Sequence, residues 1–441
     1  MKSFKIILII TLLVTFHLNS IAQNLEYSFV TVGCNRVDDA DSTANKPSTA
    51  NVYQLNRLFT EVSNVSPLPD YLFFTGDLVI GYKSDTVRLA EQLRGWISLY
   101  KASPLFGKAT KLVVIPGNHE TQNKAAGKLS FPAAERTFVR EMSEFIMGNN
   151  GPTATGLVAG TDSLTTDQSK LTYSFEHKGS HFVILNTDPV GRDWRVPNNW
   201  IDNDISTAKV NGAKHVFVFG HKPAYATVLK PTDGLVTYPS QRNIFWNILE
   251  NNNAEAMFAA HNHLWEKQQP NAGKTWQIIA GNGGSHLESA TPNPYFGYTL
   301  VKIYTEGKVT VESYGRDLNS TNYSYAADNN PTTLRETVNI SDNLATNIDD
   351  YLLMEKSIDL SIHPNPIHTA SIIKFNLLEE GPATLKIYDL KGYPVLNIVD
   401  EKLAIGNHQY SVNTSSLASG SYLVVLVNGG HQITKKIIIN R

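Results

Sequence analysis

The sequence predicts an α/β domain followed by a small all-β domain. Between residues 25 and 316, short apolar runs alternate with amphipathic helical patterns. This order is typical of a parallel or mixed sheet with helices on its faces. From about residue 360, short strand-like runs are separated by turn signals, which is typical of a small β-sandwich. The composition, 41% hydrophobic and 18% charged, is that of a globular protein.

The first 22 residues have the pattern of a signal peptide. Lys2 and Lys5 form a basic start, residues 6–14 are apolar, and Ser20-Ile21-Ala22 is a small-residue cleavage site. We expect cleavage between Ala22 and Gln23. The alternative is a membrane anchor, but the apolar run is too short to span a bilayer. No later stretch is apolar enough for a transmembrane segment.

The elements of the first domain follow from hydrophobic period and from turn residues. Helices are expected over 52–62, 87–99, 132–147, 198–210 and 240–251. Strands are expected over 29–32, 71–75, 112–115, 171–176, 181–186, 215–219, 256–260, 276–280, 298–304 and 309–314. The polar residues 148–167 are expected to form a surface loop.

Five of these strands end in residues that can bind a metal ion or move a proton. The strand-terminal segments are Gly33-Cys34-Asn35-Arg36, Gly76-Asp77, Gly117-Asn118-His119-Glu120, Gly220-His221 and His261-Asn262-His263. Ligands of α/β sheets bind at the carboxyl ends of the strands. The pattern therefore predicts that these side chains converge at one place.

The residue types favour a metal site. The two oxygens of Asp77 can bridge two cations, and Asn118 offers a neutral oxygen. Imidazoles at His221, His261 and His263 suit Zn, Fe, Mn or Ni. Taken singly, an aspartate in a turn or a histidine in a loop has an ordinary structural explanation. The whole set in one order is what indicates metal binding, with a water molecule of lowered pKa as the expected nucleophile.

These motifs resemble the ordered motifs of the calcineurin-like metallophosphoesterase superfamily over residues 25–316. The resemblance implies a two-sheet β-sandwich core flanked by helices, two metal ions and hydrolysis of phosphate esters. It implies that Asp77 bridges the ions, that Asn118, His221 and His261 complete one metal site, and that His263 belongs to the other. It further implies that His119 contacts the phosphate and protonates the leaving group.

The first motif departs from the family. The superfamily has Asp-x-His after the first strand, whereas this chain has Cys34-Asn35-Arg36. One interpretation is that Cys34 is a thiolate ligand, which favours Fe or Zn, with Asn35 as a further ligand and Arg36 holding a phosphate. The alternative is that Cys34, the single cysteine, is a small buried residue and the half-site is empty. The nearby acidic residues are a further possible substitute: Asp38, Asp39 and Asp41.

The C-terminal part has a polar linker, residues 317–357, and a β-sandwich, residues 358–441. The segment Ile362-His363-Pro364-Asn365-Pro366, together with 385–392 and 417–422, resembles the type A sorting domain of the type IX secretion system. The resemblance implies the type IX secretion machinery as a partner and export across both membranes of a Gram-negative cell. The mature protein is then secreted or attached to the cell surface. The alternative is a carbohydrate-binding or cell-adhesion sandwich.

The sequence thus supports two hypotheses. The favoured one is an exported phosphoesterase that hydrolyses phosphate mono- or diesters with two divalent or mixed-valence ions, of which Fe, Zn or Mn are expected. The other is a degenerate, non-catalytic surface protein that binds a metal or a phosphorylated ligand. A net charge of −2 argues against a nucleic-acid-binding surface.

Overall fold

The computed structural model describes residues 24–37, 52–158, 160–227, 229–288, 291, 293–318, 330–341, 360–377, 380–404, 406–428 and 431–440. The predicted signal peptide, residues 1–22, lies outside the described residues, as do Asp38, Asp39 and Asp41. The chain divides into two compact units, Met1–Leu344 and Ala345–Arg441.

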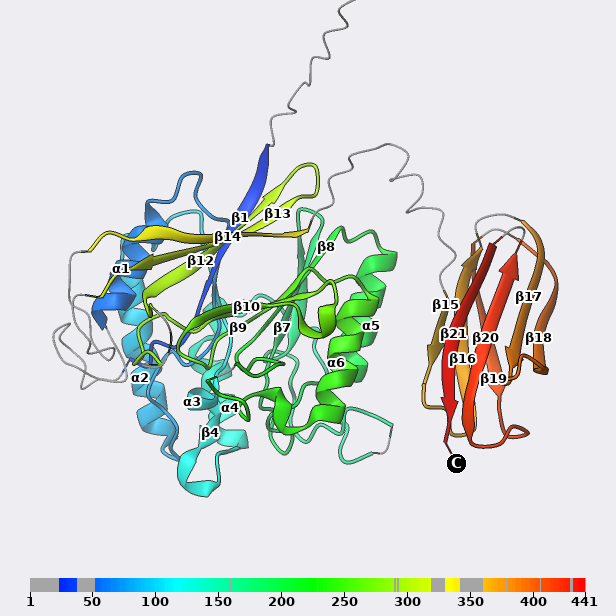
Figure 1. Cartoon of the computed structure of the whole chain (residues 1–441). Coiled ribbons are helices and arrows are strands. Elements are labelled where there is room, and N and C mark those ends of the chain that lie inside the picture. The colour runs from blue at the N-terminus through cyan, green and yellow to red at the C-terminus, as the bar shows by residue number, and fades with distance from the viewer. Residues whose placement is uncertain are drawn as a thin grey trace, which may run out of the picture. The chain divides into compact units, whose positions relative to one another are not determined.

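In the described part of the first unit, two mixed sheets carry the fold (Figure 1). Sheet A has the order β14 (Thr333–Ser341), β13 (Val309–Arg316), β12 (Phe296–Tyr304), β1 (Leu25–Val32), β2 (Tyr71–Phe74), β3 (Lys111–Val114). Sheet B has the order β10 (Trp265–Gln268), β11 (Trp276–Ala280), β9 (Ala256–Ala259), β8 (His215–Gly220), β7 (Ser180–Leu185), β6 (Tyr173–His177). Strands β1, β2 and β3 are parallel in sheet A, and β7, β8, β9 and β11 are parallel in sheet B.

Successive residues of a strand point to opposite faces of its sheet. One face of each sheet therefore packs against the other sheet, and helices cover the outer face. In β2, Leu72 and Phe74 pack with the helices of sheet A, while Phe73 faces sheet B. The helices on sheet A are α1 (Val52–Ser63), α2 (Thr86–Lys101) and α4 (Pro132–Glu141), and those on sheet B are α5 (Asn198–Val210) and α6 (Pro239–Asn251). The short α3 (Asn118–Thr121) leads into a small ribbon of β4 (Gln122–Asn123) and β5 (Leu129–Ser130).

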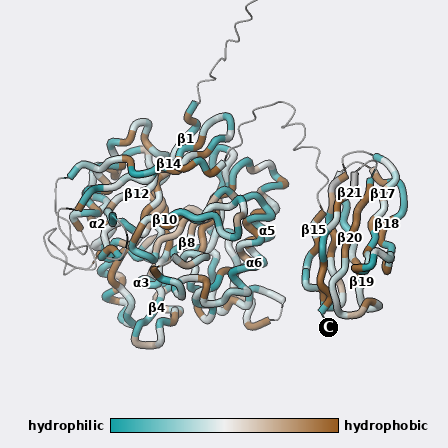
Figure 2. The backbone as a smooth tube through the Cα atoms, in the orientation of Figure 1, coloured by the Kyte–Doolittle hydropathy of each residue, from teal (hydrophilic) through white to brown (hydrophobic). Residues whose placement is uncertain are grey.

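The two sheets meet across an aromatic core. Phe29 of β1 lies edge-on to rings of both sheets, with centroid distances of 5.2–5.6 Å. Its partners are Phe73, Phe182, Phe217, Phe219 and Phe258. Strand β8 is hydrophobic along most of its length (Figure 2), and its Phe217 and Phe219 belong to this core. This packing brings the carboxyl ends of the parallel strands in both sheets to one side of the unit.

The prediction that residues 317–357 form a linker is wrong in part. Strand β14 (Thr333–Ser341) lies inside that range and pairs antiparallel with β13 as the edge of sheet A. Val338 and Ile340 are its buried apolar residues, and most of its other side chains are partly or fully exposed. An edge strand with so few apolar residues looks like a polar connector in the sequence. The predicted helix 132–147 is also too long, because α4 ends at Glu141.

The second unit contains antiparallel sheets, in agreement with the expected all-β domain. Its strands are β15 (Leu360–His363), β16 (Ala370–Leu377) and β19 (Gly406–Asn413) in one sheet, and β18 (Pro394–Leu403), β17 (Gly381–Tyr388), β20 (Gly420–Asn428) and β21 (His431–Ile439) in another. Leu385, Leu426 and Ile437 belong to their common buried core. The sequence reasoning missed β15 and β18.

We expect Phe29→Ala to destabilise the first unit by about 3–5 kcal/mol, since it removes a buried ring from the inter-sheet core. Urea unfolding monitored by circular dichroism measures this change. Phe106→Ala is the matched control, because Phe106 is 45% exposed, and its expected effect is about 1 kcal/mol or less. Equal effects of the two variants would contradict the proposed role of Phe29.

Candidate metal centre

The structure brings residues from five strand ends together. Cys34 and Arg36 follow β1, Asp77 follows β2, and Asn118 and His119 begin α3 after β3. From sheet B, His221 follows β8, and His261 and His263 follow β9. Parallel strands of sheets A and B end on the same side, so loops far apart in the sequence become neighbours.

Four of the predicted metal ligands surround one point. His221 Nε2 lies 3.1 Å from Asp77 Oδ1, 3.0 Å from Asn118 Oδ1 and 3.1 Å from His261 Nδ1. Asp77 and His221 are fully buried, and Asn118 is nearly so. Distances of this size are those expected between donor atoms that share one ion, since each donor would then lie about 2.0–2.2 Å from it.

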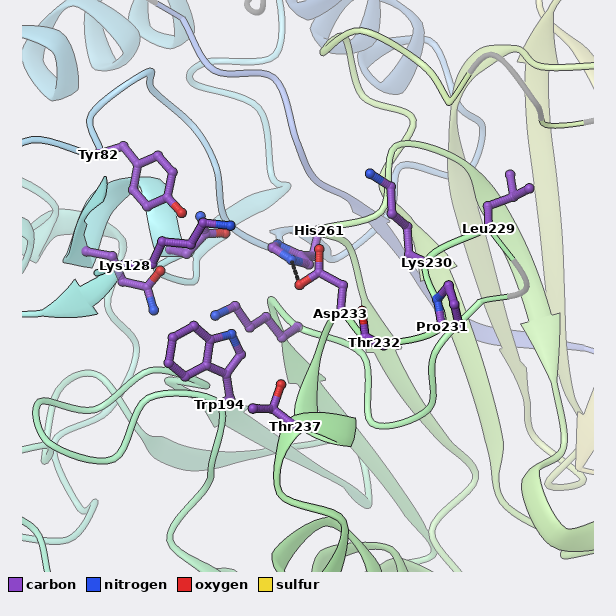
Figure 3. A pocket seen from close by; sticks show the side chains of 13 residues that line it. Tyr82, Lys128, Trp194, Leu229, Lys230, Pro231, Thr232, Asp233, Thr237 and His261 are labelled. Atoms are coloured by element: carbon purple, nitrogen blue, oxygen red, sulfur yellow. Dashed lines mark ion pairs between the residues drawn. The ribbon is translucent and has the colours of Figure 1, made fainter. Parts of the chain in front are cut away.

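His221 and His261 each direct one imidazole nitrogen toward the other, at 3.1 Å. His221 Nδ1 lies 2.8 Å from the carbonyl oxygen of Thr75, so Nδ1 carries the proton and Nε2 presents a lone pair. His261 Nε2 lies 2.9 Å from Asp233 Oδ1 without the geometry of a hydrogen bond (Figure 3), and its Nδ1 faces His221 Nε2. Two imidazole nitrogens, a carboxylate oxygen and an amide oxygen therefore face one another.

This donor set fits a divalent metal ion. Two imidazole nitrogens and two oxygens suit Zn, Fe or Mn. In the absence of an ion, a proton can take this place: burial lowers the pKa of His221, but Asp77 outweighs burial and raises it overall. Burial likewise opposes ionisation of Asp77, yet the imidazoles of His119 and His221 and the Arg36 guanidinium hold its pKa well below the usual range. Asp77 is therefore a carboxylate ready to bind a cation.

Cys34 lies next to this donor set. Its Sγ accepts a hydrogen bond from the backbone N–H of His261 at 3.1 Å. Cys34, Asp77 and His221 offer ligand atoms that all lie within 4.8 Å of one another. Burial raises the pKa of the thiol, and so does the charge of Asp77. The thiolate form thus requires a bound cation, and the ligand role of Cys34 stays a prediction.

The predicted catalytic residues both contact Asp77 or its surroundings. Arg36 donates from Nε and Nη2 to Asp77 Oδ2, each at 3.1 Å. His119 donates from Nδ1 to the carbonyl oxygen of Ile80 at 2.6 Å, and its Nε2 lies 3.9 Å from Asp77 Oδ2. Burial lowers the pKa of His119 to about 3. Its Nε2 is therefore unprotonated in the free protein, and the leaving-group role needs a proton that arrives with the substrate.

His263 and Asn35 point toward neighbouring loops. His263 donates from Nδ1 to the carbonyl oxygen of His286 at 2.5 Å, and its buried Nε2 has no hydrogen-bond partner among the described residues. The amide nitrogen of Asn35 donates to the carbonyl oxygen of Gly283 at 3.1 Å. Metal binding by either residue stays a prediction.

The backbone is strained where the ligands are presented. Cys34, Arg36, Asp77 and His261 all have left-handed φ angles, between +54° and +65°. Such angles are uncommon outside glycine and gather at functional sites. The loops that contain Gly76 and His221 also approach each other closely. A Cβ atom on Gly76 would lie only 2.6 Å from His221 Nδ1. Only glycine fits between these two loops.

Sequence reasoning assigned no role to Glu120, which ties the strand-end loops together. Its carboxylate accepts backbone N–H groups from Asp77 at 3.0 Å, Val79 at 3.1 Å and Gly117 at 2.7 Å. Burial raises the pKa of Glu120 to about 7, and the charge of Asp77 adds to this rise. Glu120 stands inside the quoted motif, so a signal was present. Asp233, the partner of His261, lies in a loop without any motif.

A cavity of about 460 Å³ opens beside the centre, with Asn118 and His261 among its lining residues (Figure 3). Tyr82 and Trp194 contribute aromatic rings to it. The Tyr82 ring lies tilted by 34° against the His119 ring, with 4.5 Å between centroids. Both aromatic residues have left-handed φ angles, +61° and +57°. Lys222 is fully buried, pairs with Asp188 at 2.6 Å, and lies 4.4 Å from the centre of the Trp194 ring. The cavity therefore offers room and aromatic surface next to the predicted metal ligands.

Comparison with known families agrees with this architecture. A model of calcineurin-like phosphoesterases matches residues 48–265, and a model of secretion system C-terminal sorting domains matches residues 361–440. The chain therefore contains a calcineurin-like metallophosphoesterase domain followed by a secretion sorting domain. Proteins with the first domain usually bind metal ions and hydrolyse phosphate esters, and the second implies export through type IX secretion.

Several solved structures have a similar arrangement. A purple acid phosphatase from yellow lupin is 15% identical, with a TM-score of 0.48 over 71% of this chain and 53% of the lupin chain. GAP50 of Plasmodium is 12% identical, with a TM-score of 0.41 over 71% of this chain and 90% of its own. A putative 5′-nucleotidase from Staphylococcus aureus is 11% identical, with a TM-score of 0.35 over 74% of this chain and 57% of the nucleotidase chain. This chain thus spans about half the length of the lupin chain. No curated protein sequence matches it significantly.

Among the described residues, no helix is both long enough and apolar enough to span a membrane.

Cys34→Ser tests whether the thiol is a metal ligand. If Cys34 binds the ion, we expect the variant to bind Zn²⁺ at least tenfold more weakly, because a hard hydroxyl replaces a soft thiolate. Elemental analysis and calorimetric titration measure this. Wild-type protein loaded with Co²⁺ should also show a thiolate charge-transfer band that the variant lacks. Unchanged Zn²⁺ affinity and no such band would show that Cys34 is only a buried small residue.

Proposed function

We propose that this chain is an exported, metal-dependent phosphoesterase that hydrolyses phosphate mono- or diesters at the centre around Asp77. The observation that carries the proposal is the convergence of Asp77, Asn118 and His261 on His221 Nε2, at 3.0–3.1 Å. A divalent ion bound there would lower the pKa of a water molecule and polarise a phosphoryl oxygen. The number of ions, expected to be two, stays a prediction.

The chain's own groups supply the rest of the chemistry. Arg36 is 16% exposed and keeps N–H groups beyond the two that it donates to Asp77, so it can bind a phosphoryl oxygen. His119 Nε2 lies 3.9 Å from Asp77 Oδ2 and can accept and return a proton. Tyr82 and Trp194 provide surface for the leaving group in the adjacent cavity.

Export is supported by the C-terminal sorting domain. With the signal-peptide pattern of residues 1–22, it favours a Gram-negative cell whose type IX machinery secretes the protein or attaches it to the cell surface. Loading with metal after export would then place the centre in contact with extracellular phosphate esters.

The second candidate is a degenerate protein that binds a metal or a phosphorylated ligand without turnover. The altered first motif favours it, since Cys34 and Arg36 stand where the family has an aspartate and a histidine. A panel of 4-nitrophenyl phosphate and bis(4-nitrophenyl) phosphate, each with Zn²⁺, Mn²⁺ or Fe²⁺, separates the two. Absence of turnover in folded, metal-loaded protein would reject the phosphoesterase.

Asp77→Asn is expected to lower kcat/KM by at least about 10²-fold, equal to about 2.7 kcal/mol of transition-state stabilisation. The amide keeps the size of the side chain but loses the charge that attracts the cation. Asp70→Asn is the matched control, because Asp70 precedes β2 at its opposite end and pairs with His177 and Lys178. Activity in Asp77→Asn equal to that of the control would remove Asp77 from the mechanism.

Trp194→Ala is expected to raise KM for 4-nitrophenyl phosphate about tenfold, since an aromatic contact with the leaving group contributes about 0.5–1.5 kcal/mol. KM for glycerol 3-phosphate, which has no ring, should change little. Trp194→Phe keeps an aromatic face and should restore most of the affinity. Equal changes of KM for both esters would show that Trp194 has a general structural role.

A further inference from the structure

The two oxygens of the Asp77 carboxylate have different partners. Oδ1 faces His221 Nε2 at 3.1 Å and accepts the backbone N–H of His119 at 3.2 Å. Oδ2 accepts both Nε and Nη2 of Arg36 at 3.1 Å. A bridging carboxylate would use one oxygen for each of two ions. Here the second oxygen already lies against a positive charge.

The backbone holds Arg36 in this position. The N–H groups of Asn35 and Arg36 both donate to the carbonyl oxygen of Asp77, at 2.9 and 2.8 Å. Val37 continues the pairing with a hydrogen bond to Leu78 at 2.7 Å. Arg36 also has a left-handed φ of +60°, and its side chain is 16% exposed. The loop after β1 is thus built to place this guanidinium beside Asp77.

Among the described residues, which do not include Asp38, Asp39 and Asp41, few candidate ligand atoms are left for a second ion. They are Cys34 Sγ, Asn35 Oδ1 and His263 Nε2, and the last is buried without a hydrogen-bond partner in that part of the chain. A zinc site takes three or four protein ligands. Arg36 stands where the family has a histidine ligand, and a guanidinium neither loses its proton nor offers a lone pair. Its charge also repels a divalent ion at short range.

We infer that the centre holds one metal ion and that the guanidinium of Arg36 takes the place of the second cation at Asp77 Oδ2. The inference deepens the proposed function and depends on it for its catalytic meaning, but the number of bound ions can be measured without any substrate. In this arrangement Arg36 neutralises the carboxylate, and its remaining N–H groups bind the phosphoryl oxygens that a second ion would otherwise contact.

The ratio of metal to protein tests the inference. The full chain is stripped with a chelator, dialysed against excess Zn²⁺ or Mn²⁺, desalted and subjected to elemental analysis, with calorimetric titration as a second measurement. We expect one ion per chain in the wild type. The double variant Cys34→Asp, Arg36→His restores the family's Asp-x-His pattern, and we expect it to bind two ions.

Arg94→Gln is the matched control for charge. Arg94 lies on α2, is 60% exposed and pairs with Glu141, so its loss removes the same charge away from the centre. This variant should keep one ion per chain. Circular dichroism tests whether each variant is folded. If the double variant is unfolded, the metal-to-protein ratios of the wild type and of Arg36→Gln decide the question, and we expect Arg36→Gln to bind a second ion.

The outcomes separate this inference from the proposed function. Two ions in the wild type would overturn the inference and leave the phosphoesterase proposal standing. One ion without turnover of any ester would support the inference and reject the phosphoesterase. A double variant that is folded and still binds one ion would show that Arg36 is not what excludes the second. No ion in folded wild-type protein would overturn both.

Discussion

A buried carboxylate is the constraint on which the first unit depends. Asp77 has no exposed surface, and a charge in that position is tolerated only when cations and N–H donors surround it. Arg36 contacts its Oδ2, while its Oδ1 accepts the backbone N–H of His119 and faces His221. The loops after β1, β2, β3 and β8 are therefore held together by one charge. The same charge makes the centre attractive to a metal ion.

The local backbone shows what this arrangement costs in conformational freedom. Left-handed φ angles at Cys34, Arg36, Asp77 and His261 are unfavourable singly, and the hydrogen bonds between the loops after β1 and β2 hold them in place. The Glu120 carboxylate accepts three backbone N–H groups at the same point. A rigid frame of this kind suits catalysis, because the donors are positioned before any ligand arrives.

Much of the fold was predictable because its signals are local. Apolar runs of period two and helices of period 3.6 placed most elements of the first unit, and strand ends marked Asp77, Asn118, His221 and His261 as partners. Strand β14 was missed because its two buried apolar residues, Val338 and Ile340, make a weak pattern at a sheet edge. Asp233 was missed because it contacts His261 only through tertiary packing.

The sequence by itself determined the residue types of the centre, their order along the chain and the presence of a sorting module, since motifs and periodicity are properties of short segments. The tertiary structure alone decided which oxygen of Asp77 faces which partner. That choice depends on the hydrogen bonds that hold the loop after β1 against the loop after β2. These loops are far apart in the sequence, so residue spacing does not predict their contact. It gave Arg36, expected from the sequence only as a phosphate ligand, a second contact with Asp77 Oδ2.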